Sequence, residues 1–466
     1  MSDVKNPSFT VSIIPIIAIG IFLGLSIFVY DAEPHMALFL GGTVAVIVAL
    51  ALGNSWKSIE DGITDAIKTA IPALIIMLII GMIIGIWIAS GVVPGLIYYS
   101  FDFMIPSLFL PAVLVFCSVV AIVTGSSWTT AGTAGVACIA IGQGMGVPVE
   151  AIAGAVVSGS FFGDKLSPLS DSTNLKPSIV GVELYEHIKH MLYTTLPAFL
   201  VGLVFFFVLG MWMTSGQNSN GDIYELQSLL GETFVFSPWL ILPPAAVITM
   251  ILFRMPAIPS LIVGVILGSI MYVSVQGANM NDMLQTLYGG YSIDTGSETM
   301  DNILSQGGMS DMYSIIALAM IALGFGGVMN KCGMLHSIVT GMMRFVRSTG
   351  NLVSTTLTSG IFINIFSANQ YLAVIIPGQM FKESFEKKNL HQKNLSRAME
   401  GSGTLTAPLI PWNSSGMFML SVLSVSPVAF APYAIVCWLT PIIVAAYGYL
   451  NITMDTDKEN KKEEVS

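Results

Sequence analysis

Charged residues are scarce in this sequence. Only 10% of the 466 residues are Asp, Glu, Lys or Arg, and 54% are hydrophobic. A soluble domain carries roughly 25% charged residues. The composition therefore excludes an ordinary water-soluble protein and predicts an all-α, polytopic membrane protein, because helices satisfy their own backbone hydrogen bonds in lipid.

Motifs of soluble enzymes are absent as well. The four cysteines show no CxxC spacing and lie in apolar stretches, which argues against a disulfide framework or a zinc site and favours a packing role. There is no GxSxG, HExxH or Walker-type loop. We expect no enzymatic activity, no cofactor and no nucleic-acid partner. A channel, or a membrane hydrolase built from Ser402 and a distant histidine, remains an alternative.

Long apolar runs recur from one end of the chain to the other. A helix needs about 20 apolar residues to cross a bilayer. The first run is too long for a signal-peptide core and lacks a cleavage site, so we expect it to be a retained span. The clearest runs are Val11 to Tyr30, Met36 to Leu52, Ile71 to Ala89, Thr194 to Met213 and Ala431 to Leu450.

The distribution of Lys and Arg predicts the orientation, because basic connections stay in the cytoplasm. Three connections lack any base and are expected outside: 31–35, 214–237 and 276–312. Both termini are then cytoplasmic. The connections expected inside carry Lys57 and Lys68, Lys176 and Lys189, Arg254, Lys331 with Arg344 and Arg347, and the 382–397 cluster, together with the polar tail 455–466.

Features of the first half return in the same order in the second half. "TGSSW" and "SPLSDST" are matched by "FSANQ" and "APLIPWNSS", at an offset of about 240 residues. Equivalent connections have opposite charge character, which predicts inverted repeats. The predicted organisation is a first transmembrane repeat at 1–213, an external linker at 214–236, a second, inverted repeat at 237–454 and a cytoplasmic tail at 455–466.

Each predicted repeat contains a hairpin and a discontinuous helix. Regions 107–142 and 352–381 start and end on one side, and whether they span or re-enter is open. Segments 151–166 and 396–409 cross but are interrupted by Gly, Ser and Pro. Unwound backbone at membrane depth lines a cavity or is buried in protein, so we expect these breaks to form the functional site.

The first break is rich in oxygen donors, which hard cations such as Na⁺ prefer. A carboxylate in a low-dielectric site holds a proton when no cation is present, so one site can exchange Na⁺ for H⁺. We expect Na⁺ at Asp164 and Asp171, although either could instead be solvated at the cytoplasmic mouth. The neutral candidate ligands are Ser167, Ser170, Thr173 and Asn174.

Further polar residues at the breaks have open roles. Glu400 is either a second ion-binding carboxylate or the partner of Arg397, three residues earlier. Lys165 either neutralises Asp164, meets an anionic substrate or lies at the interface with its charge in water. The remaining candidates, which could face the cavity or pack helices, are Thr124, Ser126, Ser127, Asn364, Asn369 and Asn413.

The stretch "FFGDKLSPLSDSTNL" (161–175), with "GSSWTTAGTAGVA" (125–137) and "PHMALFLG" (34–41), resembles the NhaC-type sodium/proton antiporter family. The resemblance implies secondary active exchange of Na⁺, or a related alkali cation, for H⁺ across a bacterial inner membrane, and we expect this exchange to proceed by alternating access of one cavity to the two sides. It points to Asp164 and Asp171. Because the family includes malate/lactate-coupled exchangers, a small organic anion is an alternative substrate. A homodimer in the bilayer is compatible with the sequence.

Overall fold

A computed structural model describes residues 7–30, 32–103, 106–214, 228–253, 255–294, 301 and 304–456. Some sequence predictions lie outside these residues. They concern Asp31, Arg254, part of the connection 276–312, most of the linker 214–236 and the tail beyond residue 456.

The described chain is helical, as the composition predicted, and contains no β-strand beyond one isolated antiparallel bridge, Leu390 to Thr456. The first helices are α1 (Phe9–Phe28), α2 (His35–Ala51), α3 (Trp56–Ala89), α4 (Val92–Phe103), α5 (Pro106–Thr124), α6 (Ser127–Thr130), the π-helix η1 (Ala131–Gly135), α7 (Val136–Gly144), α8 (Val149–Leu166), α9 (Asp171–Val180) and α10 (Leu184–Thr214).

The later helices follow residue 237. They are η2 (Pro238–Ile241), α12 (Leu242–Leu252), α13 (Ala257–Val275), α14 (Met280–Gly289), α16 (Met312–Lys331), α17 (Met334–Met342), η3 (Met343–Phe345), α18 (Thr349–Ser367), α19 (Gln370–Lys387), α20 (Gln392–Met399), the π-helix η4 (Glu400–Thr404), η5 (Ala407–Leu409), α21 (Ser414–Leu423), α22 (Pro427–Phe430) and α23 (Ile435–Leu450).

Six of the described helices are long and apolar enough to cross a membrane, namely α1, α3, α5, α10, α13 and α16. Large apolar side chains on several of them are exposed, including Trp212 at 74% and Val204 at 62%. Such a surface is stable in hydrocarbon and not in water. The chain is therefore a multi-pass membrane protein.

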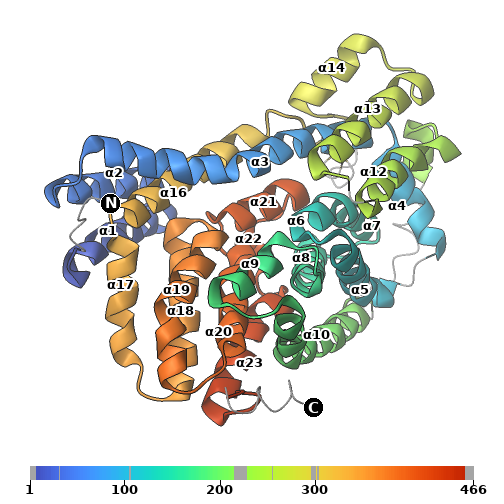
Figure 1. The fold of residues 1–466 in the computed structure, drawn as a ribbon. Coiled ribbons are helices and arrows are strands. Elements are labelled where there is room, and N and C mark those ends of the chain that lie inside the picture. The colour runs from blue at the N-terminus through green and yellow to red at the C-terminus, as the bar shows by residue number, and fades with distance from the viewer. Residues whose placement is uncertain are drawn as a thin grey trace.

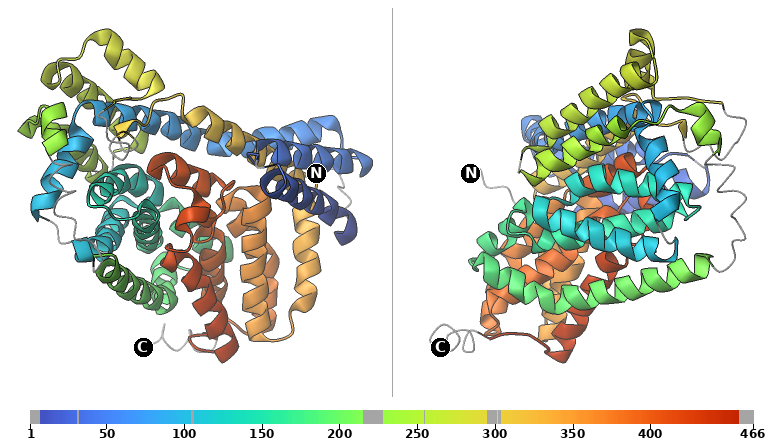
Figure 2. Two further views of the ribbon diagram at one scale, coloured as in Figure 1. Left: turned by 180° about the vertical axis from the view of Figure 1, so that it is seen from behind. Right: turned by 90° about the vertical axis from the view of Figure 1, so that its right-hand side faces the viewer.

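Two long helices, α3 and α16, pack together along one edge of the molecule (Figure 1). Beneath them lie a group containing α5, α8 and α10 and a group containing α18, α19, α20 and α23, and the same arrangement is seen from behind (Figure 2). Helices α6, α9 and α21 lie between these groups (Figure 1). The short, broken helices therefore occupy the centre of the protein.

Helices α5 and α8 approach each other closely because glycine faces the contact. A Cβ added at Gly159 would lie 2.5 Å from the carbonyl oxygen of Leu114, and one at Gly163 would lie 2.2 Å from that of Ser118. Small residues spaced four apart allow membrane helices to pack backbone to backbone. This contact fixes the end of α8, where Asp164 lies.

The helix breaks have local causes. Ser167 precedes Pro168 and is extended, at φ −81° and ψ 125°, since proline disfavours helical geometry in the residue before it. Gly125 ends α5 at φ +69°, and an added Cβ there would lie 2.8 Å from Leu169. The break after α5 therefore packs against the break after α8.

Several expected connections are helical instead. Residues 54–68 were predicted as a basic loop, but α3 begins at Trp56 and continues without interruption to Ala89. Lys176, expected in a cytoplasmic connection, lies within α9 and is completely buried. The positive-inside rule cannot identify a buried lysine, because it treats every Lys and Arg as part of a solvent-exposed connection.

Candidate functional site

A polar cavity of about 330 Å³ lies where the breaks meet. Its lining comes from α3, from the break after α5, from the end of α8, and from the starts of α9, α13, α19 and α21. The polar lining residues are Thr69, Ser126, Ser127, Thr129, Asp164, Ser170, Asp171, Ser172, Asn369, Gln370, Tyr371 and Ser414. Residues from both halves of the chain thus form one chamber.

Asp164 is a buried carboxylate in the wall of this cavity, with 6% of its surface exposed. The Ser127 hydroxyl donates to Oδ2 at 2.8 Å, and Ser170 also interacts with the carboxylate. The Thr173 hydroxyl donates to the backbone carbonyl of Asp164 at 3.1 Å. These contacts position the carboxylate in the cavity wall.

Asp171 is the first residue of α9 and lines the same cavity, but its side chain is exposed. Ser170 caps α9 by accepting from the backbone N–H of Thr173 at 3.3 Å. The chamber therefore contains one buried carboxylate, Asp164, and one exposed carboxylate, Asp171.

Three other predicted ligands support the loop and do not line the cavity. Ser167 caps the end of α8, and Thr173 is completely buried. The Asn174 amide donates to the carbonyls of Pro168 and Ser170 at 2.9 and 2.8 Å. These side chains fix the conformation of the break.

Several helix N-termini border the cavity. Helices α9, α19 and α21 start at Asp171, Gln370 and Ser414, all of which line it. Each start is capped by the preceding residue, Ser170, Asn369 or Asn413. Helix N-termini favour negative charge, so the chamber offers a favourable setting for an anionic group, whether a carboxylate of the protein or a bound organic anion.

The remaining candidates of the first half sit around Ser127. Ser126 caps α6 by accepting from the N–H of Thr129 at 3.1 Å. The Thr124 hydroxyl lies 3.3 Å from that of Thr130. The break "TGSSW" therefore folds as a capped helix start that presents Ser127 to Asp164.

Asn364 and Asn413 hold the second break together behind the cavity. The Asn364 amide donates to the carbonyls of Ser402 and Gly403 at 3.1 and 2.7 Å. The Asn413 amide donates to the backbone and side-chain oxygens of Asn364 at 3.0 and 3.2 Å. Unwound backbone buried in protein needs such partners. Both asparagines therefore hydrogen-bond the second break, and neither lines the cavity.

Glu400 pairs with Lys176, a partner that the sequence did not suggest. Lys176 Nζ lies 2.5 Å from Glu400 Oε2, and the two side chains are 0% and 2% exposed. The predicted alternative, a pair with Arg397, is wrong. The Arg397 guanidinium donates instead to the Thr453 hydroxyl at 2.8 Å and to the Thr453 carbonyl at 3.2 Å.

Lys165 is also completely buried, although it was expected to reach water if it lay at the interface. Its Nζ has no hydrogen-bond partner among the described residues. It interacts electrostatically with Glu400 and Lys176. Lys165 is therefore a buried ionisable residue, adjacent in sequence to Asp164, that does not line the cavity itself.

A second, smaller cavity of about 200 Å³ adjoins the first. The two share Thr69 and Asn369, and the Asn369 amide donates to the Thr69 hydroxyl at 3.3 Å. At this smaller cavity Asp65 and Lys331 form a 3.1 Å ion pair, with side chains 59% and 42% exposed. The two cavities therefore meet at Thr69 and Asn369, and a partly exposed ion pair borders the smaller one.

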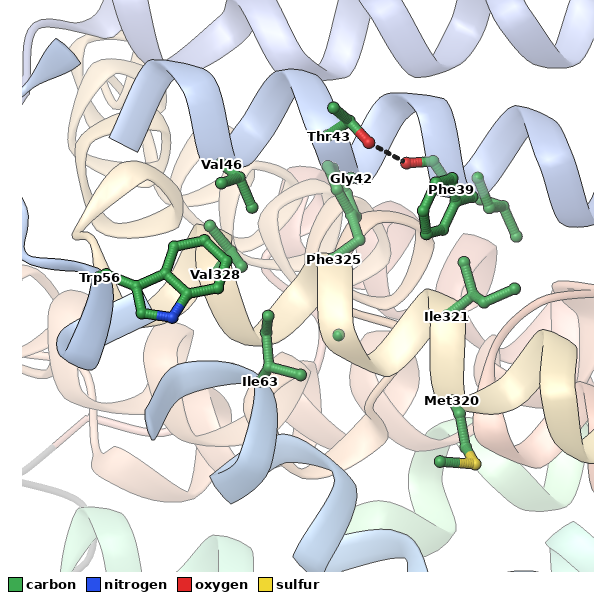
Figure 3. A pocket seen from close by; sticks show the side chains of 12 residues that line it. Phe39, Gly42, Thr43, Val46, Trp56, Ile63, Met320, Ile321, Phe325 and Val328 are labelled. Atoms are coloured by element: carbon green, nitrogen blue, oxygen red, sulfur yellow. Dashed lines mark hydrogen bonds between the residues drawn. The ribbon is translucent and has the colours of Figure 1, made fainter. Parts of the chain in front are cut away.

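A larger cavity, of about 460 Å³, lies between α2, α3 and α16 and is apolar (Figure 3). The hydroxyl of Thr43 is satisfied by the Phe39 carbonyl at 3.0 Å (Figure 3). No carboxylate lines this cavity. Volume alone would favour this apolar cavity as the functional site. A bound ion needs oxygen donors, however, and the Asp164 chamber provides them.

Comparison with known proteins agrees with this architecture. Residues 5–173 and 159–452 match the Na⁺/H⁺ antiporter family. The chain belongs to this family. It is 37% identical to the Malate-2H⁺/Na⁺-lactate antiporter of Bacillus subtilis, over 96% of each chain. It is also 37% identical to the Na⁺/H⁺ antiporter NhaC of Alkalihalophilus pseudofirmus, over 94% of this chain and 95% of the relative.

A third relative has a different stated substrate. The Arginine/ornithine antiporter ArcD of Halobacterium salinarum is 34% identical over 99% of this chain and 96% of its own. The resemblance seen in the sequence is thus confirmed at the level of the family.

Proposed function

We propose that the chain is a secondary active antiporter that exchanges Na⁺, or another alkali cation, for H⁺ at Asp164. The observation that carries the proposal is a buried carboxylate in the wall of a polar cavity, with hydroxyls of Ser127 and Ser170 beside it. Carboxylate and hydroxyl oxygens fit the donor set of a hard cation. Asp171 and Ser172 add further oxygens to the same chamber.

Exchange follows from competition for one group. Desolvation disfavours a bare carboxylate, so Asp164 is stable when it carries either a cation or a proton. Because one carboxylate cannot hold both fully, binding of one ion releases the other. The cavity then has to open to alternate sides of the membrane.

The proposed alternation uses the two halves of the chain, 1–213 and 237–454, as inverted repeats. Both halves contribute to the lining of the Asp164 chamber, which supports a motion of one half against the other. We further infer from the positive-inside rule that both termini face the cytoplasm.

The test is Na⁺-dependent proton movement in proteoliposomes. We expect Asp164→Asn to abolish it, because an amide cannot exchange a proton for a cation. Asp171→Asn should retain exchange with a weaker apparent affinity for Na⁺, since its side chain is exposed. Full activity in Asp164→Asn would refute the proposal.

A second candidate is exchange of a small organic anion coupled to these ions. Three capped helix starts border the chamber, and helix N-termini bind carboxylates. The volume of about 330 Å³ exceeds what one ion needs, since a water molecule occupies about 30 Å³. Uptake of radiolabelled malate or lactate by the purified protein distinguishes this candidate from simple cation exchange.

A further inference from the structure

An apolar layer closes one end of the Asp164 chamber, and another cavity lies beyond that layer. This far cavity, of about 80 Å³, is lined by residues of α3, α4, α7, α8 and α21, and by Gln306 and Ser424. We propose that the far cavity is the part of the ion pathway that leads to the other side of the membrane, and that the layer is its closed gate. The inference rests on the proposed function, exchange by alternating access.

The spacing of residues along three segments places the two cavities in line. In each segment a residue of the Asp164 chamber is followed, eight positions later, by a residue of the far cavity. Eight residues of an α-helix rise about 12 Å, or roughly two turns. The pairs are Ile76 and Ile84 on α3, Trp128 and Val136 in the segment from α6 to α7, and Ser414 and Val422 on α21.

The residues midway between these pairs form the layer. They are Ile80, Gly132 and Phe418, and the two side chains are completely buried. A Cβ added at Gly132 would lie 2.8 Å from Ile80 Cδ1 and 3.8 Å from Phe418 Cζ, so the three segments meet closely. An ion in this apolar layer would lose its hydration without gaining oxygen ligands, which is unfavourable. The layer therefore separates the two cavities for ions.

An aromatic stack lies on the chamber side of this layer. Trp128, which lines the Asp164 chamber, stacks on Phe418 with ring centroids 4.5 Å apart and ring planes inclined by 17°. Trp128 belongs to α6 in the first half of the chain, and Phe418 belongs to α21 in the second half. A motion of one half against the other would therefore separate the two rings and open the layer.

The Asp164 chamber and the layer differ in exposure. The chamber contains the exposed side chain of Asp171, whereas the side chains of Ile80 and Phe418 have no exposed surface. We therefore expect ions to enter the chamber from the side of Asp171 and not through the layer. This arrangement is that of a transporter open to one side.

The far cavity has polar residues in its lining. They are Gln143, Gln306 and Ser424, and the Ser424 side chain is exposed. A water molecule takes up about 30 Å³, so the cavity has room for about two. Gln306 belongs to the connection 276–312, which lacks any Lys or Arg and is predicted to be external. The far cavity would then lead to the external side.

Thiol labelling tests the assignment of the far cavity. Ala73→Cys places a thiol in the Asp164 chamber, and Gln143→Cys places one in the far cavity. The native cysteines are buried and give the background. A charged, membrane-impermeant methanethiosulfonate should react with the two variants from opposite faces of the membrane. Reaction of both from the same face, or no reaction of Gln143→Cys, would overturn the inference.

Truncation of the layer tests the gate. With the reagent on the face at which Gln143→Cys reacts, Ala73→Cys should react slowly. Addition of Phe418→Ala should raise that rate about tenfold, the factor that a barrier lower by about 1.4 kcal/mol produces, and should let Na⁺ cross liposome membranes without proton movement. Ile80→Ala should act in the same way and decides the question if Phe418→Ala does not fold. An unchanged rate in a folded variant would overturn the inference.

An added methyl group should have the opposite effect. In Gly132→Ala the new Cβ meets Ile80 Cδ1, which is the end of a flexible side chain and can shift. We expect slower reaction of Ala73→Cys from the far face and a lower maximal rate of exchange, with the half-saturating Na⁺ concentration unchanged. A purely structural layer predicts that truncation and insertion change the rates in the same direction, and that result would overturn the inference.

A matched control truncates an aromatic pair elsewhere. The rings of Phe362 and Phe366 on α18 lie 4.7 Å apart, and neither residue lines the Asp164 chamber or the far cavity. Phe362→Ala should leave the reaction rate of Ala73→Cys unchanged. Equal acceleration by Phe362→Ala and Phe418→Ala would assign the effect to lost stability and overturn the inference.

The proposed function and the proposed gate fail in different ways. If Asp164 is not the exchange site, Asp164→Asn retains Na⁺-dependent proton movement, while the labelling rates still follow the layer. If only the gate is misplaced, Asp164→Asn is inactive, while Phe418→Ala leaves both labelling and coupling as in the unsubstituted protein. Thermal unfolding in detergent checks that each variant is folded.

Discussion

At the scale of single residues, Asp164 owes its properties to neighbours within its own half. Ser127, on the short helix α6, donates to its carboxylate, and Thr173, on α9, holds its backbone carbonyl. A hydrogen bond to a charged group contributes about 1.5–3 kcal/mol. The hydroxyl of Ser127 is thus an effective stabiliser of the ionised carboxylate.

Ser127→Ala should therefore weaken cation binding. We expect the Na⁺ concentration for half-maximal exchange to rise about tenfold, because loss of about 1.5 kcal/mol favours the protonated carboxylate. Titration of Na⁺ in proteoliposomes measures the change. Ser127→Thr keeps the hydroxyl and serves as the control, and equal losses in both variants would argue against the hydrogen bond.

The same residues show what sequence reasoning can reach. Asp164 and Ser127 stand in two polar interruptions of apolar runs, so they could be predicted as site residues. Lys176 could not, since its partner Glu400 comes from the other half of the chain. Nothing in local spacing identifies that pairing, and a lysine near a break is assigned to water by default.

At the scale of helices, the contact between α5 and α8 positions the site. Gly159 and Gly163 bring α8 against the backbone of α5, while Gly125 and Ser167 end the two helices at adjacent points. The glycines and serines of this segment predicted a discontinuous helix. They did not predict the contact with α5, because that contact depends on which side of α8 the glycines face, and only the tertiary structure shows this.

Gly163→Ala is expected to separate the two helices. Its Cβ would lie 2.2 Å from the Ser118 carbonyl oxygen, and overpacking typically costs about 1–3 kcal/mol. We expect a lower melting temperature in detergent together with reduced exchange. Gly24→Ala on α1, where the added Cβ meets nothing within 4 Å, should change neither.

At the scale of the whole molecule, the composition was enough to predict an all-α membrane protein, and the family is confirmed over most of the chain. The proposed inverted repeats and the sidedness depend on charge bias between connections. Most of the predicted loop 54–68 is helical, since α3 begins at Trp56, and it extends an existing span. Sidedness therefore remains a prediction for experiment.

Cysteine labelling tests sidedness directly. Ala66→Cys places a thiol in the smaller cavity beside Asp65. We expect a membrane-impermeant maleimide to react from the cytoplasmic face alone, because α3 starts at the basic, inside end proposed for it. The four native cysteines are buried, so the unsubstituted protein supplies the background. Reaction from the opposite face would reverse the proposed orientation.

The contact between Asn369 and Thr69 has a kinetic consequence. One neutral hydrogen bond, 3.3 Å long, joins two residues that line both cavities. Such a bond contributes about 1 kcal/mol, less than twice the thermal energy. It therefore costs little to break, so the Thr69 and Asn369 side chains can separate and rejoin readily and form no lasting barrier of their own between the two cavities.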